Sequence, residues 1–130
     1  MKSLVYSEKR GIIKKEITRN DLQKRIEKVK CYINNNINNN VYIKVLSDIA
    51  CISEFHFIRV FSELCGCTPY QYIIKKRIAK AKNLLQYKAF TVFEVSQACG
   101  YESVQTFRKC FKRETGCSPR DFNRNQLAVA

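Results

Sequence analysis

The strongest constraint on the fold is a pattern that the chain contains twice. "FIRVFSELCGCTPYQY" begins at Phe57, and "FRKCFKRETGCSPRDF" begins at Phe107. Both copies fit F-x-[RK]-x-F-x-x-x-x-G-C-[TS]-P-x-x-[YF]. Because similar sequences build similar local structures, the chain should fold as two related halves.

Each shared position of the pattern has a structural role. The two aromatic residues are one helical turn apart, so Phe57 and Phe61 should form the buried edge of a helix. The glycine ends that helix, and the Thr-Pro or Ser-Pro pair starts the next one. Cys67 and Cys117 stand just before a helix cap, where a hydrophobic residue packs. We therefore expect small buried side chains there rather than redox sensors.

Apolar periodicity and capping residues predict the helices that precede the first copy. A first helix begins at a capping box of Asn20 and Gln23, continues along an apolar stripe to Ile37 and frays in "INNNINNN". A short helix over 43–50, a turn and a second helix capped by Ser53 follow.

The clearest helix in the sequence begins after the first copy's glycine. Thr68 caps it, Pro69 takes the first helical position and Gln71 closes the capping box. Its polar side is wholly basic, whereas a solvated face normally mixes both signs of charge. About 19 residues at 1.5 Å each make it near 28 Å long, comparable with the ~34 Å of one DNA turn.

The second half repeats this plan. Thr91 and Glu94 form a capping box for a short helix, and a longer helix over 103–115 follows. The turn between them contains Gly100, which corresponds to Cys51, and is one residue longer than the first turn. A Ser-Pro pair then starts a last short helix.

These helices predict an all-α fold in which two helix-turn-helix three-helix subdomains are joined by a long central helix. Spacing alone also fits any αα-corner. The boundaries that we assign are a basic flexible arm over 1–19, a first helix-turn-helix subdomain over 20–67, a linking helix over 68–86, a second subdomain over 87–125 and a tail over 126–130.

Composition restricts the partners. The chain has 24 Lys and Arg against 11 Asp and Glu, and its formal net charge of +13 favours polyanions such as nucleic acid or anionic lipid. It has no signal-peptide stretch and no apolar run of about 18 residues, so we expect a soluble cytoplasmic protein with no membrane partner. The odd number of cysteines, without the spacing of a disulfide scaffold, favours a reducing compartment.

The sequence shows no catalytic or metal site. There is a single histidine, His56, which we interpret as a packed side chain, and no pair of carboxylates in a pocket pattern. "CGC" at 65–67 lacks the paired ligands that zinc requires. We therefore expect no enzyme activity, no metal and no cofactor.

Over roughly residues 20–125 the chain resembles the AraC/XylS family of bacterial transcription regulators. "ISEFHFIRVFSELCGCTPYQYI" is similar to the family's first motif and "ACGYESVQTFRKCFKRETGCSPRDF" to its second. In size the chain is similar to the stand-alone MarA, SoxS and Rob kind of module, or to a domain of a larger regulator. The resemblance implies double-stranded DNA as ligand, RNA polymerase as partner, and the second helix of each motif in the major groove.

Two sets of contacts follow from this resemblance. The residues opposite the buried aromatic pairs are the expected base contacts: Phe55, Ile58, Arg59, Val104, Gln105, Arg108 and Lys109. Phe55 and Ile58 suit thymine methyl groups, Arg59 and Arg108 suit guanine, and Gln105 suits adenine. The expected phosphate contacts are Ser53, Lys76, Arg77, Thr106 and Lys112.

Alternatives stay open at this point. Arg59 and Lys109 also fit ordinary solvated charges, and Glu54 and Glu63 make the first reading helix weakly basic. We therefore expect the second motif or the long basic helix to dominate affinity. A duplicated motif lets one chain cover two grooves, so we expect a monomer on DNA, although a dimer fits too. A non-specific basic binder of nucleic acid or an anionic surface is the alternative function.

Overall fold

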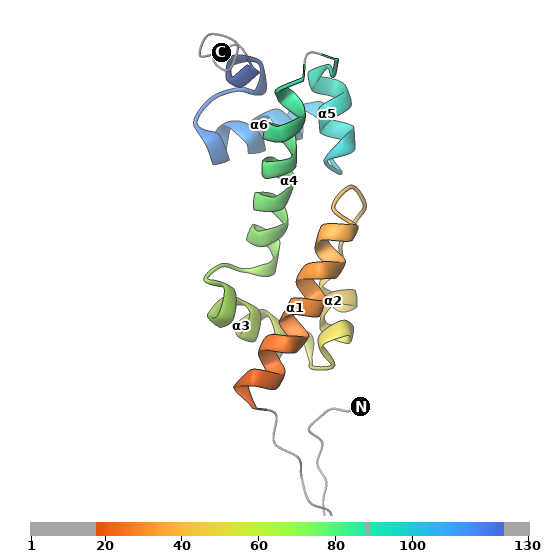
Figure 1. The fold of residues 1–130 in the computed structure, drawn as a ribbon, viewed down its shortest axis with the longest axis vertical. Coiled ribbons are helices and arrows are strands. Elements are labelled where there is room, and N and C mark those ends of the chain that lie inside the picture. Colours follow the sequence, from red (N-terminus) through yellow and green to blue (C-terminus); the bar gives the residue numbers. More distant parts are fainter. Residues whose placement is uncertain (1–17, 88, 124–130) are drawn as a thin grey trace, which may run out of the picture. The chain divides into compact units, whose positions relative to one another are not determined.

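The computed structural model describes residues 18–123 except residue 88. Every regular element in this range is a helix, which confirms the all-α prediction (Figure 1). The helices are α1 (Arg19–Asn35), α2 (Ile43–Ala50), α3 (Glu54–Cys65), α4 (Pro69–Leu85), α5 (Val92–Ala98) and α6 (Val104–Thr115). Residues 119–123 are helical as well. The predicted basic arm lies outside the described residues except for 18 and 19, and so does the predicted tail over 126–130.

The described residues form two units, and each unit contains one helix-turn-helix motif. The first unit comprises 18–36 and 41–71, and the second comprises 37–40 and 72–123. In the first unit α1 packs against both α2 and α3 (Figure 1). In the second, α5 contacts α6, and both share a core with α4.

The repeated aromatic pairs occupy the same place in both units. Phe57 and Phe61 are fully buried, with ring centroids 5.7 Å apart and an interplanar angle of 56°. Phe107 and Phe111 are also fully buried, at 5.7 Å and 55°. The near-identical geometry confirms that the shared sequence positions specify packing.

Other buried apolar side chains complete each core. In the first unit they are Ile26, Val29, Ile33, Leu46, Ala50 and Val60. In the second they are Ile74, Ile78, Ala81, Leu85, Val95, Cys99 and Cys110. The predicted α1 stripe ends earlier than expected, because Ile37 follows the helix and belongs to the second unit.

Most predicted helix starts are confirmed by hydrogen bonds, but the first is wrong. Thr18, rather than Asn20, caps α1: its Oγ1 accepts from the backbone N of Asp21 at 3.0 Å, and the Asp21 carboxylate accepts from the Thr18 N–H in return. A carboxylate in the first turn also favours this start, because it faces the positive end of the helix dipole. Reciprocal boxes form as predicted at Thr68 for α4 and at Thr91 for α5.

The positions after each helix-stopping glycine differ from expectation. Cys67 and Cys117 are half-buried rather than buried, whereas Pro69 and Pro119 have less than 2% of their surface exposed. The proline ring is therefore the part of the Cys-Thr/Ser-Pro segment that packs in the core, and the cysteine lies at its edge.

The two turns of the helix-turn-helix motifs share one backbone feature. Cys51 has φ +60° and Gly100 has φ +87°, so both residues adopt the left-handed conformation and the sequence alignment of these positions is correct. From the left-handed residue to the next helix cap, Gly100 to Ser103 is one residue longer than Cys51 to Ser53, as predicted.

Candidate nucleic-acid interface

Helix α6 separates its residues into a buried and an exposed face. Phe107, Cys110 and Phe111 are buried. Gln105, Thr106, Arg108, Lys109 and Lys112 are exposed, and Val104 is half-buried. All predicted contacts on α6 therefore lie away from the core, along one side of the helix where a ligand has access.

The exposed face of α6 carries uncompensated positive charge. Among the described residues, no carboxylate forms an ion pair with Arg108, Lys109 or Lys112. The single acidic residue of the helix, Glu114, lies in the last turn and accepts from Arg113 Nε at 3.3 Å. Unpaired cations on one helix face attract a polyanion such as DNA.

Helix α3 exposes an apolar surface instead. The Phe55 side chain is 84% exposed and that of Ile58 is 39% exposed, next to an exposed Arg59. Exposed apolar side chains that lie next to each other, as Phe55 and Ile58 do three positions apart on one helix, are typical of contact surfaces. Glu54 and Glu63 are also exposed, so α3 is weakly charged, as the sequence indicates.

Serine caps both of these helices. Ser53 Oγ accepts from the His56 backbone N at 3.2 Å, and Ser103 Oγ accepts from the Thr106 backbone N at 3.3 Å. A capping hydroxyl can still donate one hydrogen bond, so the predicted phosphate contact by Ser53 is chemically open. The predicted packed histidine, His56, is half-buried.

The predicted phosphate contacts on α4 differ in their surroundings. Lys76 is exposed, with its Nζ 5.4 Å from the centroid of the Tyr72 ring. Arg77 is half-buried: its Nε donates to the Ile37 carbonyl at 3.1 Å and its Nη2 to the Asn39 carbonyl at 2.9 Å. These bonds hold the 37–40 segment within the second unit, so the geometry favours a structural role for Arg77.

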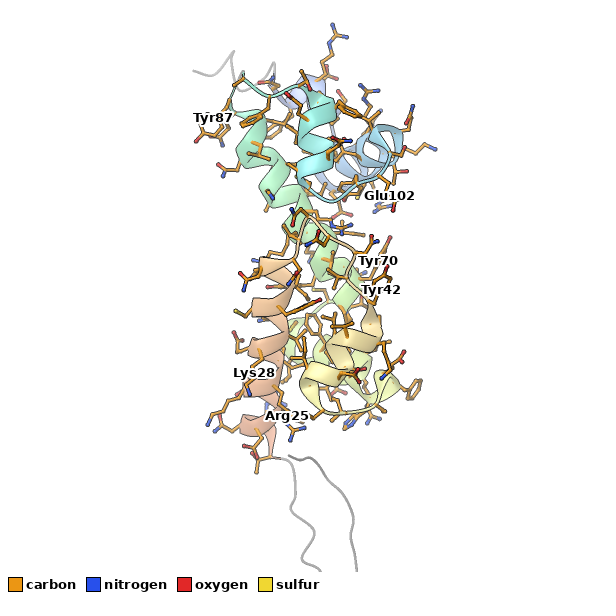
Figure 2. The ribbon with its side chains drawn as sticks, turned by 90° about the vertical axis from the view of Figure 1, so that its right-hand side faces the viewer. Arg25, Lys28, Tyr42, Tyr70, Tyr87 and Glu102 are labelled. Carbon is orange, nitrogen blue, oxygen red and sulfur yellow. The ribbon has the colours of Figure 1, made fainter. Side chains whose placement is uncertain are left out.

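Sequence reasoning missed a basic residue that has the same role in each unit. Arg25 Nη1 donates to the carbonyl of Ala50, the last residue of α2, at 2.9 Å. Lys80 Nζ donates to the carbonyl of Ala98, the last residue of α5, at 2.8 Å. Figure 2 labels Arg25 on α1. Both cations cap the C-terminal end of the first helix of a motif, where positive charge is favourable.

We also searched the described residues for metal-binding clusters, membrane-spanning helices and disulfides. They hold no cluster of three or more His, Cys, Asp or Glu side chains that suits a metal ion. None of the helices within 18–123 combines the length and apolarity needed to cross a membrane. The seven cysteines are free thiols, and burial raises the pKa of Cys99 to about 11.

Comparison with known proteins finds a helix-turn-helix family and relatives named as transcriptional regulators. The profile of a helix-turn-helix domain family matches residues 46–125. The chain is 31% identical to the uncharacterized HTH-type transcriptional regulator YdiP of Escherichia coli, over 92% of this chain and 37% of that protein. It is 29% identical to the probable transcriptional regulator LumQ of Photobacterium leiognathi, over 75% of this chain and 41% of that protein. It therefore spans less than half the length of these two regulators.

Solved structures share the fold. The crystal structure of the DNA-binding domain of the transcriptional factor AdpA, in complex with a target DNA, superposes with a TM-score of 0.76 at 28% identity. The match covers 81% of this chain and 95% of that one. The family profile thus covers residues from within α2 to beyond α6, and so includes both helix-turn-helix motifs. The chain therefore belongs to the AraC-type helix-turn-helix family of DNA-binding transcription regulators, not to a family of enzymes.

Proposed function

We propose that this chain binds double-stranded DNA in a sequence-specific way, with α3 and α6 as recognition helices in successive major grooves, and thereby regulates transcription. One observation carries the proposal: the two helices bury the same aromatic pair and expose different residues. A repeat that served folding alone would not require the exposed Phe55 on one helix or the exposed Arg108 on the other. The relatives named as transcriptional regulators support the same function.

The exposed residues divide into two kinds of contact. On α3, Phe55 and Ile58 suit thymine methyl groups, and Arg59 suits guanine O6 and N7. On α6, the base contacts are Val104, Gln105, Arg108 and Lys109. The phosphate contacts that the geometry supports are Ser53, Lys76, Thr106 and Lys112.

Binding to selected and random duplexes tests this proposal. The target is first obtained by selecting bound sequences from a random duplex pool. Arg59→Ala or Arg108→Ala should then relax preference at one base pair each, by about 1 to 3 kcal/mol. Lys76→Ala should weaken the selected and random duplexes by the same factor, because a phosphate contact carries no sequence information. Equal weakening of both duplexes by the two arginine changes would contradict base readout.

The alternative function is non-specific binding of nucleic acid or an anionic surface, which the charge of +13 favours on its own. A competition between the selected duplex, a random duplex, single-stranded RNA and anionic vesicles separates the two functions. Sequence-specific binding requires the selected duplex to compete far better than the other three. Equal competition by all four competitors would contradict sequence-specific binding and favour non-specific binding instead.

The proposal also covers the oligomeric state, a protein partner and the location of the chain. We propose that the chain binds one DNA site as a monomer, because its two motifs supply both recognition helices. Sedimentation of the complex should give one chain per duplex.

We also propose a contact with RNA polymerase and a cytoplasmic location, where both DNA and polymerase are present. Copurification of the chain with polymerase on the selected duplex tests the contact.

A further inference from the structure

The Gln105 side chain on α6 is held in one orientation by its neighbour. Ser103 Oγ lies 2.9 Å from Gln105 Oε1 and 3.3 Å from the Thr106 backbone N. The backbone N–H can only donate, so the serine oxygen accepts that bond. The near atom of Gln105 is its amide oxygen, which can only accept, so the serine hydrogen points to Gln105 Oε1. The amide oxygen is therefore drawn toward the first turn of the helix.

This orientation decides which atoms Gln105 offers to a ligand. A planar amide that turns its oxygen toward the helix directs its Nε2 hydrogens elsewhere. Gln105 is exposed, so these donors are accessible from solvent. A glutamine that pairs with adenine needs both atoms on the base, the oxygen for N6 and the nitrogen for N7. The Ser103 bond opposes that arrangement.

We propose, on the basis of the function proposed above, that Ser103 makes Gln105 a hydrogen-bond donor in the major groove, so that it selects a keto base, guanine or thymine, on the strand that it faces. Guanine offers two acceptors, O6 and N7, and thymine offers O4, whereas adenine offers N7 alone beside an amino group and cytosine offers only an amino group. Gln105 is the specificity-determining residue, and Ser103 is the residue that positions it. This replaces the adenine preference expected from residue type alone.

The first motif provides a matched reference. Ser53 caps α3 through the His56 backbone N, as Ser103 caps α6. The residue that corresponds to Gln105 is Phe55, which has no polar atom for the serine to orient. Changes at Ser53 therefore reproduce the capping and charge effects of changes at Ser103. They also remove the phosphate contact proposed for Ser53, which weakens all sequences alike, and they leave no amide to reorient.

The decisive variant is Ser103→Asp. Aspartate is a good helix cap, so α6 should keep its N-terminal bond. A carboxylate only accepts hydrogen bonds, so it should attract Gln105 Nε2 and turn Oε1 outward. We expect the preference at the base pair read by Gln105 to shift by about tenfold from keto toward amino bases on that strand. Ser103→Thr keeps a donating hydroxyl and should retain the keto preference.

The measurement is the affinity of the full chain for the selected duplex, with each base pair replaced in turn by the other three. Gln105→Ala identifies the base pair, because preference should be lost there alone. Ser53→Asp adds the same charge near the DNA and should weaken all duplexes without changing preference at that pair. The proposal is overturned if Ser103→Asp weakens all duplexes as Ser53→Asp does, or if Gln105→Ala changes no preference. Either result leaves the proposed function intact as long as Arg108→Ala still relaxes specificity.

Discussion

At the scale of single residues, Gly100 has the least freedom to change among the three described glycines. Its φ is +87°, and a Cβ added there would lie 2.6 Å from the Ile37 carbonyl oxygen and 3.0 Å from Arg77 Nη2. Gly116 in the same unit has φ +89°, but a Cβ added there would lie in open space, with nothing within 4 Å. Substitutions at the two glycines therefore distinguish the effect of backbone strain, which both share, from that of steric contact, which occurs only at Gly100.

We predict that Gly100→Ala destabilises the protein more than Gly116→Ala does. Both changes place a side chain in the left-handed region, at a cost of about 1 to 2 kcal/mol. Gly100→Ala must in addition displace the 37–40 segment or the Arg77 guanidinium. Chemical denaturation followed by circular dichroism measures both changes. Equal losses of unfolding free energy would mean that the 37–40 segment moves away without cost.

The buried thiol of Cys99 gives stability a dependence on pH. Burial raises its pKa from 9.0 to about 11, and burial also raises the pKa of Tyr101. Both groups are neutral when protonated, so the folded state holds their protons more tightly than the unfolded state. Stability is therefore complete below about pH 9 and falls as pH rises from 9 toward 11.

We predict that Cys99→Ala flattens this decline. The variant has no thiol to ionise, so its unfolding free energy should fall less steeply between pH 9 and pH 11 than that of the unchanged protein. Denaturation midpoints across this range provide the measurement. Cys31→Ala is the control, because Cys31 is exposed and its removal should leave the slope unchanged. A parallel decline in the Cys99 variant would assign the effect to other groups.

At the scale of elements, the basic residues of α4 have different roles. Lys80 donates to the Ala98 carbonyl at 2.8 Å, whereas Lys76 is exposed beside the Tyr72 ring. We predict that Lys80→Ala lowers the unfolding free energy by about 1 to 2 kcal/mol, because a bond to a charged donor is lost from the end of α5. Lys76→Ala should leave stability nearly unchanged and weaken DNA binding. Thermal melts and duplex titrations distinguish these outcomes, and a stable Lys80→Ala protein would contradict the capping role.

The elements also indicate what the sequence can predict. Helix starts such as Thr91, with its box partner Glu94, depend on residues three positions apart and were correctly predicted from the sequence. The predicted start of α1 was wrong because two capping signatures overlap there. Thr18 forms the capping box, since it has the acidic partner Asp21 three positions later. The Lys80 cap joins residues 18 positions apart, and the Arg25 cap joins residues 25 apart, so no local pattern contains them.

The same limit applies to the candidate interface. The exposed faces of α3 and α6 follow from helical periodicity once the buried aromatic pairs are known, so all seven predicted base contacts lie away from the core. The family resemblance implied Arg77 as a phosphate contact, but its bonds to the Ile37 and Asn39 carbonyls depend on tertiary structure. Likewise, the type of residue 105 predicts adenine, and only its bond to Ser103 indicates otherwise.

At the scale of the whole molecule, α4 connects the two motifs. It is one continuous helix from Pro69 to Leu85, and it begins in the first unit and continues into the second. Its 17 residues span about 26 Å at 1.5 Å per residue. A helix of this kind is stiffer than a Gly- or Ser-rich linker, which adapts its length to its binding sites.

We therefore predict a strict spacing between the two half-sites on DNA. An insertion of about 5 base pairs rotates one half-site to the opposite side of the duplex, and one of about 10 base pairs restores the side but adds ~34 Å. Both insertions should reduce affinity to that of a single half-site, because α4 cannot lengthen. An equal insertion outside the selected sequence is the control and should have no effect. Full affinity after the longer insertion would mean that α4 does not set the spacing, and that the two motifs find their grooves independently.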